Sequence, residues 1–312
     1  MLHLLGGIYL GWSLGANDAA NVFGTAVSSK MIRFMTAALL CSAFVILGAV
    51  LEGQAGMQTI GALSNQSLYT ATLTSIGAAV SITLMTVLRI PSSTSQAVVG
   101  SIIGVGIFGE GLRLAGLTKV VLCWVGTPIG ALVVAVVLYR SLGWLLNYLR
   151  LSIYAHDYTL RVGLILSGAY GAYALGANNV ANVTGVYVAA GLLTVPQATL
   201  IGASSIALGV LTYSKPVMMT VGRKIVRLDA FSALVVVLAE ALTIHAYAWI
   251  GVPVSTSQAV VGAVIGVGLI KQASSVKGSV VGRILLGWLV TPLVAALISI
   301  LLWFLTHLRY VA

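Results

Sequence analysis

The sequence predicts an all-α integral membrane protein with about ten transmembrane or re-entrant helical segments, arranged as two repeats of inverted topology. Composition is the first reason. Hydrophobic residues make up 59% of the chain and charged residues only 7%, whereas soluble domains carry about 25% charged residues. So few charges cannot cover a surface exposed to water, so we expect a lipid bilayer to surround most of the chain.

An internal repeat is the second reason. The run from Ser93 to Gly100 returns with every residue identical at 255–262. Three further pairs follow in the same order, namely 14–21 with 175–182, 57–61 with 218–222, and 124–128 with 288–292. The chain therefore divides into a first repeat over residues 1–145, a cytoplasmic connector over 146–160 and a second repeat over 161–312.

Each repeat is predicted to contain five segments. They cover 4–27, 34–52, 68–88, 92–109 and 118–140 in the first repeat, and 162–190, 197–214, 231–250, 254–270 and 283–306 in the second. The fourth segment of each repeat is short and rich in glycine, which favours a re-entrant arm over a full span.

Basic residues are the third reason, because they follow opposite patterns in the two repeats. In the first repeat Lys30 and Arg33 follow segment one, and residues 53–67 after segment two carry no basic residue. In the second repeat 191–196 carry no charge, and the basic residues follow segment two (Lys215, Arg223, Lys224 and Arg227). Basic loops stay cytoplasmic. The repeats are therefore expected to be inverted in a cell membrane, with both termini external, and Arg113 and Arg309 are exceptions.

Several other classes of protein are disfavoured. The net charge of +10 comes from basic residues between apolar runs, which favours contacts with lipid headgroups over nucleic acid. Cys41 and Cys123 lie within apolar runs and indicate neither a disulfide framework nor a metal site. No catalytic motif is present, so we expect no enzyme, whereas an inverted repeat is typical of secondary transporters.

The first candidate site is a doubled polar cluster inside the apolar segments. It comprises Asn17, Asp18 and Asn21, and their counterparts Asn178, Asn179 and Asn182. An unpaired carboxylate in lipid is costly, and carboxylate and amide oxygens are ligands for hard cations such as sodium. Hydrogen bonding between helices is the alternative role. Glu240 is either a further cation ligand or a hydrogen-bonded structural group.

The second candidate site is a pair of predicted helix starts. They contain Pro91, Ser93, Thr94, Ser95 and Gln96, and Pro253, Ser255, Thr256, Ser257 and Gln258. Proline ends the preceding helix and serine caps the next one. A helix N-terminus offers unpaired N–H groups and partial positive charge, so each start predicts an anion site. The alternative interpretation is that each motif is an ordinary capped helix start at the membrane surface, without an anion site.

Neither candidate site contains Lys or Arg. An anion bound there would be repelled by the nearby Asp18 carboxylate unless a co-bound cation, or a proton on Asp18, neutralised it. The sequence therefore favours symport of an anion with Na⁺ or H⁺.

These residues resemble the signatures of the inorganic phosphate transporter (PiT) family. The matching stretches are 15–21, 176–182, 91–96, 253–258 and 218–228, and the resemblance covers nearly the whole chain. It implies a symporter that imports phosphate by alternating access, with phosphate between the two Ser-Thr-Ser loops and no cofactor. It also implies Na⁺ ligands at Asn17, Asp18, Asn21, Asn178 and Asn182, and it is compatible with a homodimer.

Three departures from the family pattern leave the substrate open. Asn179 replaces an aspartate, Gln96 and Gln258 replace histidines, and Ser95 and Ser257 replace threonines. The Ser-Thr-Ser form is similar to a sulfate-transporting branch of the family, so sulfate is the alternative substrate. Asp18 favours phosphate, because it could accept the proton of HPO₄²⁻. An anion channel is a more distant alternative, since a channel would not need Asp18.

Overall fold

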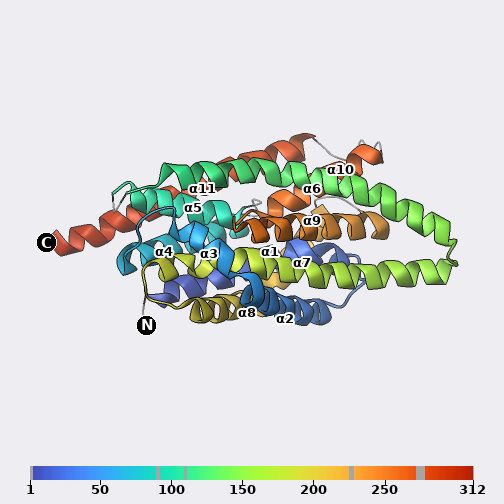
Figure 1. Cartoon of the computed structure of the whole chain (residues 1–312), viewed down its shortest axis with the longest axis horizontal. Coiled ribbons are helices and arrows are strands. Elements are labelled where there is room, and N and C mark those ends of the chain that lie inside the picture. Colours follow the sequence, from blue (N-terminus) through green and yellow to red (C-terminus); the bar gives the residue numbers. More distant parts are fainter. Residues whose placement is uncertain (1–2, 89–91, 109–110, 225–227, 272–277, 312) are drawn as a thin grey trace.

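The computed structural model of the chain describes residues 3–88, 92–108, 111–224, 228–271 and 278–311. These residues form eleven α-helices, and the long ones run roughly along the long axis of the molecule (Figure 1). The helices are α1 (Leu4–Ser28), α2 (Phe34–Glu52), α3 (Gln54–Gly61), α4 (Leu68–Val87), α5 (Thr94–Gly106), α6 (Leu114–Leu149), α7 (Ile153–Ala189), α8 (Val195–Lys224), α9 (Ala230–Ile250), α10 (Thr256–Ile270) and α11 (Gly278–Val311).

Seven of the described helices are long and apolar enough to cross a membrane, namely α2, α4, α6, α7, α8, α9 and α11. The all-helical membrane architecture is therefore confirmed. Each predicted segment corresponds to one helix, and α5 and α10 are the short apolar helices expected as the fourth segments. The additional helix α3 lies in a stretch expected to be a loop, where it follows α2 after the single residue Gly53.

Helices α6 and α7 are much longer than the sequence pattern indicated, with 36 and 37 residues. They take up most of the connector expected over 146–160, and only residues 150–152 lie between them. Arg150 has a left-handed backbone with φ of 46°, and the Ser152 hydroxyl accepts a hydrogen bond from the Ala155 amide. These two features reverse the chain and start α7 at once, so the connector is a tight turn.

Glycines set the closest helix contacts, and they do so in pairs. A Cβ on Gly15 of α1 would lie 1.9 Å from a backbone oxygen of α8, and one on Gly176 of α7 would lie 2.0 Å from a backbone oxygen of α2. Gly100 of α5 and Gly262 of α10 approach the backbones of α11 and α6 in the same way. Matching residues of the two halves therefore pack on matching helices.

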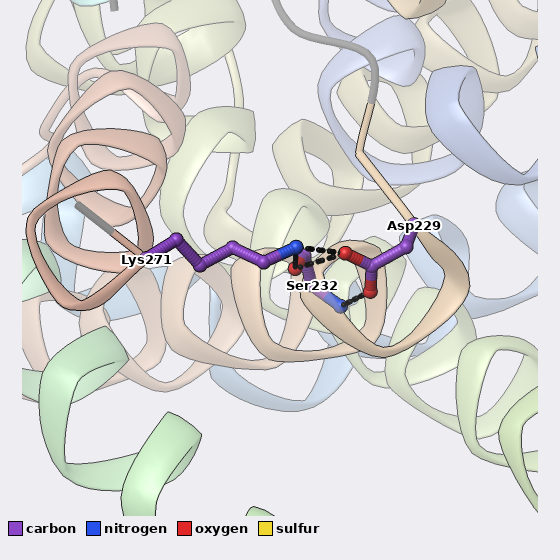
Figure 2. Close-up of polar contacts among 3 residues, drawn as sticks. All are labelled: Asp229, Ser232 and Lys271. Atoms are coloured by element: carbon purple, nitrogen blue, oxygen red, sulfur yellow. Dashed lines mark hydrogen bonds and ion pairs between the residues drawn. The ribbon is translucent and has the colours of Figure 1, made fainter. Parts of the chain in front are cut away.

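Helices α9 and α10 form a hairpin, and an ion pair joins the start of α9 to the end of α10. Figure 2 shows the Lys271 side chain reaching Asp229 at the start of α9, where the Asp229 carboxylate caps the helix by accepting from the Ser232 amide at 2.9 Å. Because Lys271 directly follows α10, the turn over residues 251–255 lies at the opposite end of the hairpin. That turn contains the second predicted anion loop.

Candidate functional site

Both predicted anion loops end in a serine-capped helix start. The Ser93 hydroxyl oxygen accepts from the Gln96 amide at 3.3 Å at the start of α5, and Ser255 accepts from the Gln258 amide at 3.3 Å at the start of α10. Before α10 the chain turns at Gly251, whose φ is 75°. All the predicted loop residues Ser93, Thr94, Ser95, Gln96, Ser255, Thr256 and Gln258 are buried, and Ser257 is half-buried. Pro91 lies outside the described residues.

The two anion loops lie against each other and exchange hydrogen bonds. The Ser95 hydroxyl donates to the Val254 carbonyl oxygen at 2.9 Å, and the Ser257 hydroxyl donates to the Ser92 carbonyl oxygen at 3.1 Å. The equivalent serine of each loop thus binds the backbone of the other loop. Two helix N-termini from opposite halves of the chain therefore meet in one place, with their partial positive charges and N–H donors close together.

The predicted cation cluster of the first half (Asn17, Asp18 and Asn21, on α1) contacts both loops. The Asn17 amide donates to one oxygen of the Asp18 carboxylate at 2.9 Å, and the Thr94 hydroxyl donates to the other at 3.2 Å. The Asn21 amide donates to the Thr256 hydroxyl oxygen at 3.0 Å. Because Thr94 starts α5 and Thr256 starts α10, this cluster on α1 connects the two anion loops.

The predicted cation cluster of the second half (Asn178, Asn179 and Asn182, on α7) contacts the same loops. The Asn182 amide donates to the Ser95 hydroxyl oxygen and to the Asn179 side-chain oxygen, both at 2.9 Å. The Asn178 amide donates to the Val254 carbonyl oxygen at 2.9 Å, and its side-chain oxygen accepts from the Val254 amide at 3.3 Å. The structure therefore brings the predicted cation and anion residues of both halves into a single polar centre.

Several buried oxygens in this centre lack a hydrogen-bond donor among the described residues. They include the Asn182 side-chain oxygen and one carboxylate oxygen of Glu240. Glu240 and Asp18 are both 2% exposed, they interact electrostatically, and the described residues contain no ion pair to either of them. A buried carboxylate without a countercharge is costly, so this set of acceptor oxygens is suited to a hard cation such as Na⁺ or to a proton.

Partly exposed polar residues extend from the centre along one face of α1. The site residues Asn17 and Asn21 are partly exposed, and so are Thr25 and Ser28 further along the same helix. Residues four apart share a helix face. A partly accessible polar stripe therefore runs from the centre to the end of α1 at Ser28.

A separate cavity of about 580 Å³ lies at the α3 side of the centre, and sequence reasoning missed it. Its polar lining includes Gln54, Gln58, Gln66 and Arg113, and the Arg113 guanidinium donates to Asn65 at 2.8 Å. The sequence contained one indication of this cavity. Gln54 and Gln58 are four residues apart in the stretch expected to be a loop, and this spacing places them on one face of a helix. Arg113 appeared in the sequence only as an exception to the topology pattern.

Glu52 and His245 also meet, although no pattern in the sequence pairs them. The His245 Nε2 atom lies 2.6 Å from a Glu52 carboxylate oxygen. They lie on α2 and α9, which are 193 residues apart in sequence at this contact.

Comparison with known proteins gives consistent matches over nearly the full length. Residues 14–299 match the model of the phosphate transporter family. The chain is 32% identical over 301 residues to a protein of Methanocaldococcus jannaschii that carries the name phosphate permease, covering 96% of each chain. It is 32% identical over 308 residues to the sulfate permease CysP of Bacillus subtilis, covering 96% of this chain and 86% of that one. The solved structure of a sodium-dependent phosphate transporter matches with a TM-score of 0.86 and 25% identity, covering 99% of this chain and 100% of that one.

Proposed function

Because the chain belongs to the phosphate transporter family, we propose that it is a secondary active symporter that imports inorganic phosphate by alternating access, with Na⁺ as the coupling ion. The reciprocal hydrogen bonds from Ser95 and Ser257 are the main support, since they bring two helix N-termini together. Phosphate would accept hydrogen bonds there from backbone N–H groups and from the hydroxyl groups of the two loops.

Sodium would occupy the buried oxygens next to the anion. The proposed ligands are the side chains of Asn17, Asp18, Asn21, Asn178 and Asn182, with Asn179 and Glu240 close to them. An anion beside two carboxylates is repelled until a cation neutralises them, so phosphate should bind tightly only after sodium. The sodium dependence of the related transporter of known structure supports this choice. A proton on Asp18 would serve the same purpose, and H⁺ is the alternative coupling ion.

We further propose that the two halves are inverted repeats in a cell membrane with both chain termini external. Both termini lie at the same end of the molecule, and the α6–α7 turn lies at the other (Figure 1). Helix α1 ends on the side of that turn (Figure 1), so the basic residues Lys30 and Arg33 after α1 and Arg150 in the turn itself support a cytoplasmic location for this side. The polar stripe on α1 ends at Ser28 on the same side, so it is the proposed exit to the cytoplasm.

Sulfate is the second candidate substrate. Two observations favour it, namely the 32% identity to the sulfate permease CysP and the Ser-Thr-Ser-Gln sequence of both loops. Phosphate can donate its proton to Asp18, whereas sulfate has no proton to donate at neutral pH. Only phosphate can therefore form a hydrogen bond as a donor to Asp18, and for this reason phosphate is the main proposal.

Uptake into proteoliposomes would test both assignments. The purified protein would be given radiolabelled phosphate or sulfate under an imposed inward gradient of Na⁺ or H⁺. We expect phosphate uptake that rises with the Na⁺ gradient and is unaffected by excess sulfate. Sulfate uptake that phosphate does not inhibit would overturn the proposed substrate, and uptake that responds to neither gradient would indicate a channel. Light scattering of the purified protein would test the homodimer.

A further inference from the structure

A cluster of titratable and aromatic side chains lies beside the polar centre and is not part of it. Glu52 is the last residue of α2, and its carboxylate accepts from the Trp249 indole at 3.0 Å as well as contacting His245. The other nitrogen of His245, Nδ1, lies 2.7 Å from the Tyr170 hydroxyl. The ring of Tyr173 packs on His245 with 5.4 Å between ring centres. Helices α2, α7 and α9 therefore meet around one histidine–glutamate pair.

The first half of the chain contains the same cluster without the charged pair. Tyr9 and Trp12 precede Tyr170 and Tyr173 by 161 residues, and Thr83 precedes His245 by 162. The Tyr9 hydroxyl donates to the Thr83 hydroxyl oxygen at 2.8 Å, as Tyr170 contacts His245.

The counterpart of Glu52 in this neutral cluster is Tyr213, whose ring lies 5.6 Å from that of Trp12. Neutral side chains therefore fill the same position in the other half. Packing at this position does not require a carboxylate and an imidazole, so the Glu52–His245 pair needs another explanation.

The position of the pair connects it to the second anion loop. His245 is on α9, which ends at Ile250 and leads directly into the turn at Gly251. Glu52 leads through Gly53 into α3, and the Thr59 hydroxyl of α3 donates to the Gly251 carbonyl oxygen. A change in the distance between the ends of α2 and α9 would therefore move the loop whose Val254 carbonyl binds Ser95.

The neighbouring helices also carry ionisable groups, and their contacts show which of them face the pair. On α7 the groups that face the pair are Tyr170 and Tyr173. Three groups on or next to neighbouring helices have partners of their own: Asp18 of α1 accepts from Asn17 and Thr94, Lys215 of α8 lies over the Phe34 ring, and Lys271 after α10 pairs with Asp229. Glu240 of α9 faces the Asp18 carboxylate, and Cys123 of α6 faces Tyr247. Helix α3 contains no titratable side chain. Among the described residues, the side chains that act on the Glu52 carboxylate are Tyr173, His245 and Trp249.

We propose that Glu52 and His245 form a proton-binding site, separate from the anion and cation centre, whose proton holds the end of α2 against α9 and makes transport dependent on pH. The link to transport rests on the proposed function. A neutral imidazole and a carboxylate take up one proton from water and become an imidazolium–carboxylate pair, and loss of that proton returns it to water. Histidine changes charge between about pH 5 and 8. The carboxylate can exchange protons because the Glu52 side chain is 30% exposed.

Two measurements on the full-length protein test this site. The first is ¹⁵N NMR of protein labelled at its four histidines, with His245 identified by comparison with His245→Gln. We expect the His245 signal to change with pH, and this pH dependence to differ between the wild type and Glu52→Gln. A pH dependence that is unchanged in Glu52→Gln overturns the site, and this result does not depend on transport.

The second measurement is phosphate uptake between pH 5.5 and 8.5 at a fixed Na⁺ gradient. Phosphate speciation is the same for every variant, so the informative quantity is the ratio of variant to wild-type uptake at each pH. We expect this ratio to change at least about fivefold across the range for Glu52→Gln and for the double variant Glu52→Tyr/His245→Thr, which reproduces the neutral cluster. The mirror control Thr83→Val should give a constant ratio.

A constant ratio in the folded double variant overturns the link between this site and transport. Absence of phosphate uptake by the wild type at every pH is a failure of the proposed function instead. In that case the NMR titration still decides whether Glu52 and His245 share a proton.

Discussion

The side-chain amide of Asn182 lies 2.9 Å from the hydroxyl oxygen of Ser95 and donates a hydrogen bond to it. Because the Ser95 hydroxyl donates in turn to the Val254 carbonyl oxygen, a continuous chain of hydrogen bonds joins the cation cluster on α7 to both anion loops. A cation bound at Asn182 and an anion bound at Ser95 would share this chain. Binding of either ion should therefore affect binding of the other, to the same extent.

Replacement of Asn182 by alanine tests this coupling. The variant removes one proposed cation ligand and leaves the buried Ser95 hydroxyl without its donor, and each loss costs on the order of 1–3 kcal/mol. We expect the apparent affinities for Na⁺ and for phosphate both to fall about tenfold, as measured by uptake at varied ion concentrations. The control Asn147→Ala changes an exposed residue of α6. A fall in Na⁺ affinity with unchanged phosphate affinity would contradict the coupling.

Replacement of Asp18 by asparagine tests the requirement for a carboxylate. The side chain keeps its size but loses the negative charge that attracts the coupling cation. We expect Na⁺-driven phosphate uptake to fall at least about tenfold, because the loss of one charge-assisted contact is worth about 1.5–3 kcal/mol. The matched control is Asp157→Asn, since Asp157 is exposed and its contact with Arg161 is 3.9 Å long. Wild-type uptake by Asp18→Asn would favour the channel alternative.

Replacement of Gly15 by alanine tests the helix packing. The new Cβ would lie 1.9 Å from the Ile206 carbonyl oxygen, which belongs to a helix backbone and cannot rotate away. Overpacking of this kind costs about 1–3 kcal/mol or more, so we expect a clearly lower melting temperature in detergent.

The matched control for Gly15→Ala is Gly130→Ala, where the nearest atom is a Thr243 methyl carbon at 3.8 Å. It should leave the melting temperature unchanged or raise it, because alanine favours helix by about 1 kcal/mol over glycine. Equal melting temperatures for Gly15→Ala and the wild type would show that α1 and α8 do not pack this closely.

The contact between Asp229 and Lys271 predicts a dependence of stability on pH. Burial alone would raise the pKa of Asp229, but hydrogen bonds from Lys271 and Ser232 outweigh it and lower that pKa. A lowered pKa means that the carboxylate stabilises the fold above its unfolded pKa of about 3.9, and that this stabilisation disappears as the pH falls through the lower folded value.

Melting temperatures of the wild type and Asp229→Asn between pH 3 and 7 would test this prediction. We expect the wild type to be the more stable near neutral pH, and the difference to shrink as the pH falls below about 4. Asp157→Asn again serves as control, because an exposed pair contributes little. A difference that stays constant over the whole range would rule out a contribution from the Asp229 charge.

The residues of the proposed site stand out in the sequence because their signals are local. Serine before a helix start, proline in the turn and an asparagine repeated after four residues follow from rules that act over one or two helical turns. Duplication strengthened each signal, since Ser93 to Gly100 recurs without a change. By contrast, the pairing of Glu52 with His245 joins residues 193 positions apart, and the sequence contains no local pattern that would reveal it.

Helix α3 and the cavity at Arg113 could not be predicted from the sequence either, because both depend on contacts between distant residues. Residues 54–61 are short and only moderately apolar, so the packing of Gly56 and Gly61 against α7 decides that they form a helix. The sequence by itself determined the membrane class, the repeat and the chemistry of the polar loops, because hydropathy, periodicity and capping depend on neighbours along the chain. Only the tertiary structure decided which loops meet and which charges pair, because those contacts depend on how distant helices pack.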